Sequence, residues 1–169
     1  AINFGIVYGI SAFSLSQDLH ISVAEAKEYI EHYMQTYPAI RGYLESSVEH
    51  AAQVGYTETL YGRRRYIPEL KSANGAVRAL GRRMALNAPL QGTAADIVKM
   101  AMVRVARALA EELPSARMIM QVHDELVLEC PPEDADRAAE ILRREMEGVG
   151  SDFPVPLTVD VEIGHNWLK

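Results

Sequence analysis

The sequence predicts an α+β fold, with a helical N-terminal part followed by a small antiparallel sheet and a helix packed on that sheet. Three observations support this prediction. Apolar residues recur at helical spacing through most of the first 112 residues. After Pro114 the pattern changes to the alternation typical of strands, and residues 133–147 return to helical spacing. A chain of 169 residues with 49% hydrophobic content can also bury a substantial core.

Four N-terminal segments have the start and stop signals of helices. Ser11 can cap a short helix, and Ser22 with Glu25 forms a capping-box pattern ahead of the next one. Pro38 suits the first turn of a further helix, and Gly55 suits its end. The predicted helices cover residues 1–9, 11–19, 23 to before 38, and 38–54.

A longer helical region contains a predicted interruption. Residues 75–112 have a helical composition, but Pro89 removes a backbone donor and Gly92 weakens the helix nearby. We therefore expect either a kink or two abutting helices, with Thr93 as the N-cap of the second helix in the latter case. A further amphipathic helix is predicted over residues 133–147.

Three features have the alternation or the turn residues of β-structure. Gly62 lies between two short β-like segments, and residues 121–125 lie between two apolar runs, so both places predict hairpin turns. A last β-like segment follows the C-terminal helix. The predicted strands cover residues 56–60, 65–67, 117–122, 125–130 and 156–163.

The net charge of −6 conceals a strong asymmetry along the chain. Residues 61–107 carry ten Lys or Arg and two acids, a balance of +8, so the remainder carries −14. A basic centre in an acidic chain suits a surface that binds a polyanion, although a solvated helix face has the same composition. No apolar run approaches the ~18 residues of a membrane span. The single cysteine, Cys130, excludes a disulfide framework within one chain and suits a reducing compartment.

The stretch QVHDE, residues 121–125, places three ionisable side chains at the tip of the second hairpin. His123 and Asp124 both tolerate positive φ, which is a sufficient structural reason for them to occupy a turn. The adjacent carboxylates of Asp124 and Glu125 repel each other, however, and a divalent cation nearby relieves that repulsion. A rigid hairpin also suits phosphoryl transfer, where catalysis depends on positioning and charge neutralisation.

A complete two-metal site is not visible in this sequence. Two Mg²⁺ ions held ~3.5–4 Å apart need at least two well-placed carboxylates from different segments. Asp124 can supply one of them, and among the other aspartates only Asp160 lies on a predicted strand. We therefore expect this chain to contain part of a metal site, and we interpret the chain as a fragment.

Four segments, in order along the chain, resemble motifs of the family A (DNA polymerase I-like) DNA polymerases. The resemblance covers nearly the whole chain, and four motifs in order are far more specific than any one of them. The closing stretch VEIGHNW, residues 161–167, is similar to the C-terminal signature of the family. The four segments are NFGIVYG at 3–9, LYGRRR at 60–65, Arg83 with NAPLQGTAAD at 87–96, and QVHDE at 121–125.

The resemblance implies catalytic and nucleotide-binding roles. Asp124 would be one of the two metal-binding catalytic aspartates, with Glu125 beside it in an assisting role. His123 would contact the region of the primer terminus. Phe4 and Tyr8, one helical turn apart, would face the incoming dNTP, consistent with the π-face that every base offers to an aromatic ring.

The resemblance also implies contacts with primer–template DNA. Arg83, Asn87 and Gln91 are spaced i, i+4, i+8 and would form one polar stripe along the minor groove. Donors of this kind can test the shape of a base pair, because minor-groove acceptors are present in every pair. Arg63 and Arg64 would contact backbone phosphates, which is the less specific prediction.

In this family the chain would comprise a partial fingers subdomain, residues 1–80, and the C-terminal part of the palm, residues 81–169. Two Mg²⁺ ions, dNTP and primer–template DNA are the implied cofactor and partners, in the bacterial cytoplasm at the nucleoid. The Lys and Arg of the fingers motif would precede Ala1, and the second catalytic aspartate lies in the missing N-terminal palm, so palm and thumb are also implied partners. We expect the isolated chain to be inactive.

Several alternatives remain open at this point. Phe4 and Tyr8 can be core residues, and the polar stripe can satisfy the backbone of a kinked helix. His123 can simply fill a turn. The whole chain can be a non-catalytic nucleic-acid-binding module that uses its basic centre. It can also be a metal phosphohydrolase that uses the His123–Asp124 pair, although the other histidines, His20, His32, His50 and His165, form no suitable ligand pattern.

Overall fold

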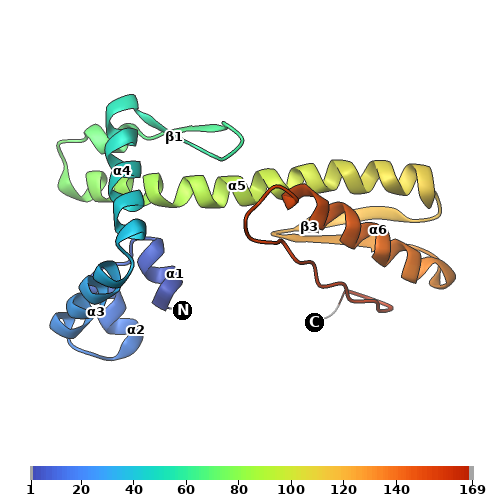
Figure 1. Ribbon diagram of the computed structural model, residues 1–169, viewed down its shortest axis with the longest axis horizontal. Helices are drawn as coiled ribbons and strands as arrows, with labels where there is room; N and C mark the ends of the chain where they lie inside the picture. The colour runs from blue at the N-terminus through green and yellow to red at the C-terminus, as the bar shows by residue number, and fades with distance from the viewer. Residues whose placement is uncertain (1, 168–169) are drawn as a thin grey trace. The chain divides into compact units, whose positions relative to one another are not determined.

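A computed structural model describes residues 2–167 of the chain (Figure 1). The chain divides into two compact units, residues 1–93 and 94–169. Helices dominate the first unit, and the second combines helices with a hairpin, as the α+β prediction requires. Ala1, the first residue of the predicted N-terminal helix, lies outside the described residues. None of the helices in the described part of the chain has the length and apolar character needed to cross a membrane.

The helices of the first unit begin and end where the capping signals predict. Ser11 accepts a hydrogen bond from the backbone N–H of Ser14, and Ser22 and Glu25 form both bonds of the capping box. Gly55 ends the fourth helix with a φ of +88°, which glycine adopts without strain. These helices are α1 (Ile2–Val7), α2 (Ala12–Leu19), α3 (Val23–Thr36) and α4 (Pro38–Val54).

A short hairpin and a turn of 3₁₀-helix follow. Strands β1 (Tyr56–Glu58) and β2 (Arg64–Tyr66) pair antiparallel, with Gly62 in the loop at a φ of +78°, as predicted. The 3₁₀ turn η1 (Pro68–Lys71) then leads to α5 (Gly75–Glu112).

The alternative of two abutting helices in residues 75–112 is wrong. Helix α5 is continuous from Gly75 to Glu112 with Pro89 inside it. Proline costs about 3 kcal/mol in a helix interior, because the carbonyl four residues earlier loses its donor. Packing offsets this cost, since Ala85 and Ala88 on this stretch are both buried. Thr93 is consequently not an N-cap. It lies within the helix, and its hydroxyl oxygen accepts a hydrogen bond from the backbone N–H of Leu60.

Small residues form one face of α5 within the first unit. Gly81, Ala85, Ala88 and Gly92 are spaced 4, 3 and 4 residues apart, which keeps them on one side of an α-helix. Ala85 belongs to a core cluster with residues of α4 and of the segment before η1. A Cβ atom at Gly81 would lie 2.8 Å from the backbone nitrogen of Leu70, so η1 packs directly on the helix backbone. That cluster contains Val48, Ala51, Ile67, Leu70 and Ala85.

The second unit packs a hairpin and a helix on the C-terminal half of α5 (Figure 1). Strands β3 (Arg117–Val122) and β4 (Glu125–Glu129) pair antiparallel with an irregular register near Ile119. After the 3₁₀ turn η2 (Pro132–Asp134) comes α6 (Ala135–Glu147), which a short turn η3 (Gly148–Gly150) ends. The core cluster combines Val105, Ala108, Leu109, Leu113, Ala116, Leu126, Ala138 and Ile141.

The predicted final strand is wrong. Residues 156–163 are not part of any sheet in the structure. Their burial nevertheless alternates, with Leu157, Val159 and Val161 less exposed than their neighbours, so the sequence pattern is real. The backbone of Val159 is bonded by side chains of α6 instead: its N–H donates to Glu147, and its carbonyl accepts from Arg143. The alternation of apolar and polar residues therefore reflects one less exposed and one more exposed side of this segment, not pairing with another strand.

Ion pairs also join α6 to α5 in the second unit. Glu112, near the end of α5, accepts hydrogen bonds from Arg137 and Arg144 of α6. Arg104 donates to Glu145, which is mostly buried. The Arg144 guanidinium, followed by that of Arg137, lowers the pKa of Glu112, and hydrogen bonds from Arg144 and then Arg104 lower the pKa of Glu145.

Glycine substitutions test the small-residue face of α5. We expect Gly81→Ala to destabilise the chain by about 1–3 kcal/mol, because its Cβ would overlap backbone atoms of η1. The matched control is Gly42→Ala on α4, where a Cβ would meet no atom within 4 Å. This control should stabilise the chain by about 0.5–1 kcal/mol. Urea unfolding measures both, and equal effects of the two substitutions would contradict the close packing at Gly81.

Acidification tests the ion pairs. Because the pKa of Glu112 in the folded chain is below its usual value of 4.5, the pair stabilises the fold above pH 4.5 and loses that contribution as pH falls through the lowered pKa. We therefore expect Glu112→Gln to lower Tm at pH 7 and to have little effect at pH 3. Glu111→Gln, the adjacent exposed acid, is the control. Thermal unfolding from pH 7 to 3 measures this, and a pH-independent difference between Glu112→Gln and the parent would refute it.

Candidate active site

The turn between β3 and β4 holds His123 and Asp124, as predicted. Val122 pairs with Glu125, so His123 and Asp124 form the whole loop of the hairpin. His123 adopts a φ of +53°, and the side-chain amide of Gln121 donates to the His123 carbonyl at 2.6 Å. Asp124 does not have positive φ, and its side chain is exposed. The carboxylate of Asp124 is therefore held on a short, locally bonded turn and is open to a ligand.

Glu125 begins β4 next to Asp124 and contacts the C-terminal segment. The indole nitrogen of Trp167 donates to Oε2 of Glu125 at 3.3 Å. Trp167 is the single tryptophan of the chain and is about half exposed. The C-terminal segment thus lies against the same hairpin end that carries Asp124.

Arg83, Asn87 and Gln91 share a face of α5, as predicted for one continuous helix. At 3.6 residues per turn this face lies roughly opposite the small-residue face. Arg83 and Gln91 are exposed, whereas Asn87 is half-buried. The Oδ1 atom of Asn87 is buried and has no hydrogen-bond partner among the described residues. The other polar atom of that amide, its nitrogen, is a donor.

Phe4 of α1 and Tyr8, in the turn directly after this helix, contact each other. Their rings are 6.3 Å apart at 21°, a stacked arrangement. Phe4 is 69% exposed, so the alternative that it is a core residue is wrong, whereas Ile6 of the same helix is buried. Gly9 follows at a φ of +76°, and a Cβ there would lie 3.0 Å from Leu86 of α5, so the end of this segment packs closely on α5.

Arg63 and Arg64, predicted as phosphate contacts, both bind within the chain. The Arg63 guanidinium donates to the Gly92 carbonyl of α5 at 2.9 Å. The Arg64 guanidinium donates to Glu58 at 2.6 Å and lies 4.5 Å from the centre of the Tyr56 ring. The hydrogen bond to Glu58 raises the pKa of Arg64 above its usual value. The sequence alone did not indicate these intramolecular contacts.

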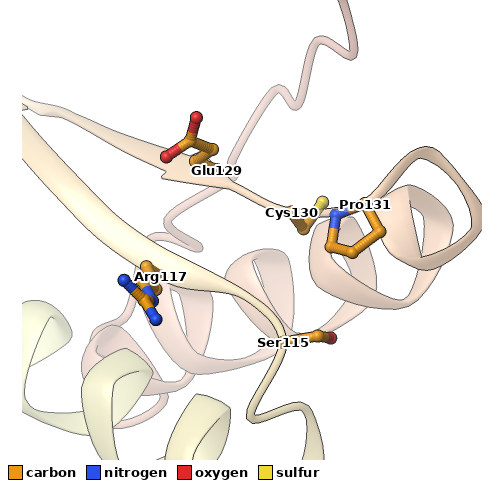
Figure 2. A pocket seen from close by; sticks show the side chains of 5 residues that line it. All are labelled: Ser115, Arg117, Glu129, Cys130 and Pro131. Carbon is orange, nitrogen blue, oxygen red and sulfur yellow. The ribbon is translucent and has the colours of Figure 1, made fainter.

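A shallow pocket of about 350 Å³ lies at the open end of the β3–β4 hairpin (Figure 2). Figure 2 shows Arg117 and Glu129 on the two adjacent strands, with Cys130 and Pro131 beyond them. Burial, followed by the nearby acids Asp134 and Glu133, raises the pKa of the Cys130 thiol, which keeps it protonated at neutral pH. None of the predicted site residues lines this pocket. The candidate chemistry is on the exposed turn at the other end of the hairpin.

The carboxylates of the turn suit Mg²⁺ in type but not in number. Carboxylate oxygen is the ligand that Mg²⁺ prefers, and Asp124 and Glu125 both offer it. Among the described residues, however, no group of three or more His, Cys, Asp or Glu side chains lies close enough together to hold a metal ion. The described residues therefore form no complete metal site, and the same finding gives no support to a His–Asp phosphohydrolase centre.

Comparison with known proteins identifies the family. The family model "DNA polymerase family A" matches residues 1–169, the entire chain. The chain belongs to this family. A thermostable DNA polymerase I of Thermus aquaticus is 50% identical over 168 residues, which cover 99% of this chain and 20% of that polymerase. DNA polymerase I of Pseudomonas aeruginosa is 47% identical over 167 residues, 99% of this chain and 18% of that protein.

A solved family A structure has the same fold. It is the POL domain of Pol1 from M. smegmatis, in complex with DNA primer-template and dNTP. The TM-score is 0.85 at 40% identity, and the match covers 94% of this chain and 28% of that one. The chain thus spans about a fifth of the length of its polymerase I relatives.

The structure adds residues that sequence reasoning missed. Gly92 and Thr93 were treated as features of a helix interruption, yet both contact the loop of the β1–β2 hairpin. Trp167 was part of a family signature and had no assigned contact. Contacts of this kind do not follow the period of a helix or strand, so periodicity could not predict them. The feature that Gly92, Thr93 and Trp167 share in the sequence is that each belongs to a motif of the family.

Tryptophan fluorescence tests the contact at the hairpin turn. We expect Glu125→Ala to shift the emission of Trp167 to longer wavelength and to increase its quenching by acrylamide, because the indole loses the acceptor that holds it against β4. Glu129→Ala, an exposed acid at the other end of the same strand, is the matched control and should leave the emission unchanged. Unaltered emission and quenching in Glu125→Ala would show that the contact is absent in solution.

Proposed function

We propose that the full-length protein containing this chain is a DNA-directed DNA polymerase. The observation that carries the proposal is the match of the whole chain to DNA polymerase family A, together with an exposed carboxylate, Asp124, on the rigid turn of the β3–β4 hairpin. The reaction is template-directed nucleotidyl transfer. The primer 3′-hydroxyl attacks the α-phosphate of a dNTP, a new phosphodiester bond forms, and pyrophosphate leaves.

In this proposal Asp124 supplies one ligand of a two-metal site and Glu125 assists it. Mg²⁺, when bound, neutralises the charge of the triphosphate. A two-residue turn limits the directions that the Asp124 carboxylate can adopt, which suits a reaction that depends on positioning. Further carboxylates must come from outside the described residues, in the N-terminal palm that we propose as part of the full-length protein. Without them we expect the isolated chain to be inactive.

The proposed ligands of the first unit are dNTP and primer–template DNA. The stacked, exposed pair of Phe4 and Tyr8 offers an aromatic surface to the incoming nucleotide. Arg83, Asn87 and Gln91 carry side-chain donors, which match the acceptors of the minor groove. His123 contacts the primer terminus. The M. smegmatis relative was captured with primer-template DNA and dNTP, which supports both as ligands here.

The intramolecular contacts of Arg63 and Arg64 reduce the support for their role as phosphate ligands. We propose a location at the nucleoid in the bacterial cytoplasm, which the bacterial source of the polymerase I relatives supports. A non-catalytic DNA-binding module is the remaining alternative.

Substitution of Asp124 tests the proposed activity. In the full-length protein we expect Asp124→Asn to lower the rate of primer extension about a thousandfold, because loss of a metal ligand removes several kcal/mol of transition-state stabilisation. The matched control is Asp136→Asn on the exposed first turn of α6, which should retain activity. Single-turnover extension of a primed template measures both.

Two results would contradict the proposal. A full-length protein that binds DNA in a salt-dependent manner but extends no primer would be the non-catalytic module. Primer extension by the isolated 169-residue chain would refute the expectation that its catalytic site is incomplete.

A further inference from the structure

The loop of the β1–β2 hairpin, residues 59–63, is rigid and packs on α5. Within the loop, Thr59 Oγ1 accepts from the backbone N–H groups of Tyr61 and Arg63 at 3.3 and 3.1 Å. The Thr59 N–H donates to the Arg63 carbonyl, and the Gly62 N–H donates to the Thr59 carbonyl, both at 3.0 Å. The Thr59 side chain is buried. The loop therefore has a defined shape before any ligand is considered.

Three contacts connect this loop to the helix. Thr93 Oγ1 of α5 accepts from the Leu60 N–H at 3.0 Å. The Arg63 guanidinium donates to the Gly92 carbonyl at 2.9 Å. A Cβ at Gly92 would lie 2.6 Å from Thr59 Cγ2, so the loop packs where a side chain would otherwise be. The loop is thus held against two consecutive residues of α5, Gly92 and Thr93.

These contacts occur next to the polar stripe and just after Pro89. The proline leaves the helix without one of its backbone hydrogen bonds in this region, which reduces the local resistance to twisting. Gln91 immediately precedes the two residues that the loop contacts, and Asn87 lies one turn before it. Because all these residues are on one helix, contacts at Gly92 and Thr93 can bias the rotation of the segment that carries Asn87 and Gln91.

We propose that Thr93 and Arg63 are positioning residues for the DNA-binding face of α5. The 59–63 loop sets the rotation of the helix beside Pro89, so that the donors of Asn87 and Gln91 meet the primer–template minor groove. Arg63 thereby acts through the helix rather than as a phosphate ligand. This inference rests on the proposed polymerase function and deepens it, because it names residues that set affinity for primer–template without contacting it.

A matched pair of substitutions in the full-length protein tests the proposal. Thr93→Val keeps the shape of the side chain but removes the acceptor for the Leu60 N–H, whereas Thr93→Ser keeps the acceptor. We expect Thr93→Val to raise the KM for primer–template about 5- to 10-fold with a nearly unchanged kcat, the effect of one unsatisfied backbone donor. Thr93→Ser should behave like the parent. Thr36→Val, which removes an exposed hydroxyl on α3, is the control for the chemical change.

A double-mutant cycle separates positioning from simple stability. If Thr93 acts by orienting Gln91, Thr93→Val should add little to the KM increase caused by Gln91→Ala, so that the two effects are not additive. Additive effects, or a Thr93→Val that lowers Tm but leaves KM unchanged, would overturn the proposal. Arg63→Gln, at an exposed position, enters the same cycle if Thr93→Val fails to fold. A parent protein that extends no primer would instead refute the underlying function.

Discussion

Gly81, Ala85, Ala88 and Gly92 leave one face of α5 almost without side chains, and the packing of η1 and of the β1–β2 loop depends on the resulting close approach. The 3₁₀ turn η1 packs on the backbone at Gly81, and the hairpin loop packs at Gly92. Larger residues at these positions would displace both elements. Because both faces belong to one continuous helix, the face that packs inward also determines the face that points outward.

The outward face of α5 carries the donors expected to contact DNA. Arg83, Asn87 and Gln91 lie roughly opposite the small residues, so packing and recognition occupy different sides of the same helix. The second unit uses another rigid support for its chemistry: Asp124 lies on a two-residue turn closed by strand pairing. Both groups of candidate residues are held by regular backbone rather than by long loops, which suits functions that depend on accurate positioning.

Local rules predicted most of the fold. The caps at Ser11 and Ser22 and the helix end at Gly55 were confirmed, since each depends on residues within a few positions of one another. The errors arose where a local rule met a tertiary contact. Pro89 does not end its helix, and Ala85 and Ala88 beside it are buried. Residues 156–163 form no strand, and side chains of α6 bind the backbone of Val159 within them.

For the candidate site as well, local patterns were predicted correctly and tertiary contacts were not. The apolar runs on both sides of residues 121–125 predicted that Asp124 lies in a hairpin turn, and the structure agrees. The family motif predicted that Phe4 faces a nucleotide, and the side chain of Phe4 is exposed. The motifs could not separate residues that face a ligand from residues that hold the fold. Arg63 was read as a phosphate contact, whereas its guanidinium binds a carbonyl 29 residues away.

From the sequence by itself one could establish the family, the α+β class, the helix caps and the position of the hairpin turns. These properties depend on residue type and short-range spacing, which the chain displays directly. Only the tertiary structure decided that α5 is continuous, that Thr93 accepts from Leu60, and that Trp167 contacts Glu125. Such contacts join residues more than 30 positions apart, and no periodic pattern records them, because they exist only after packing has brought the segments together.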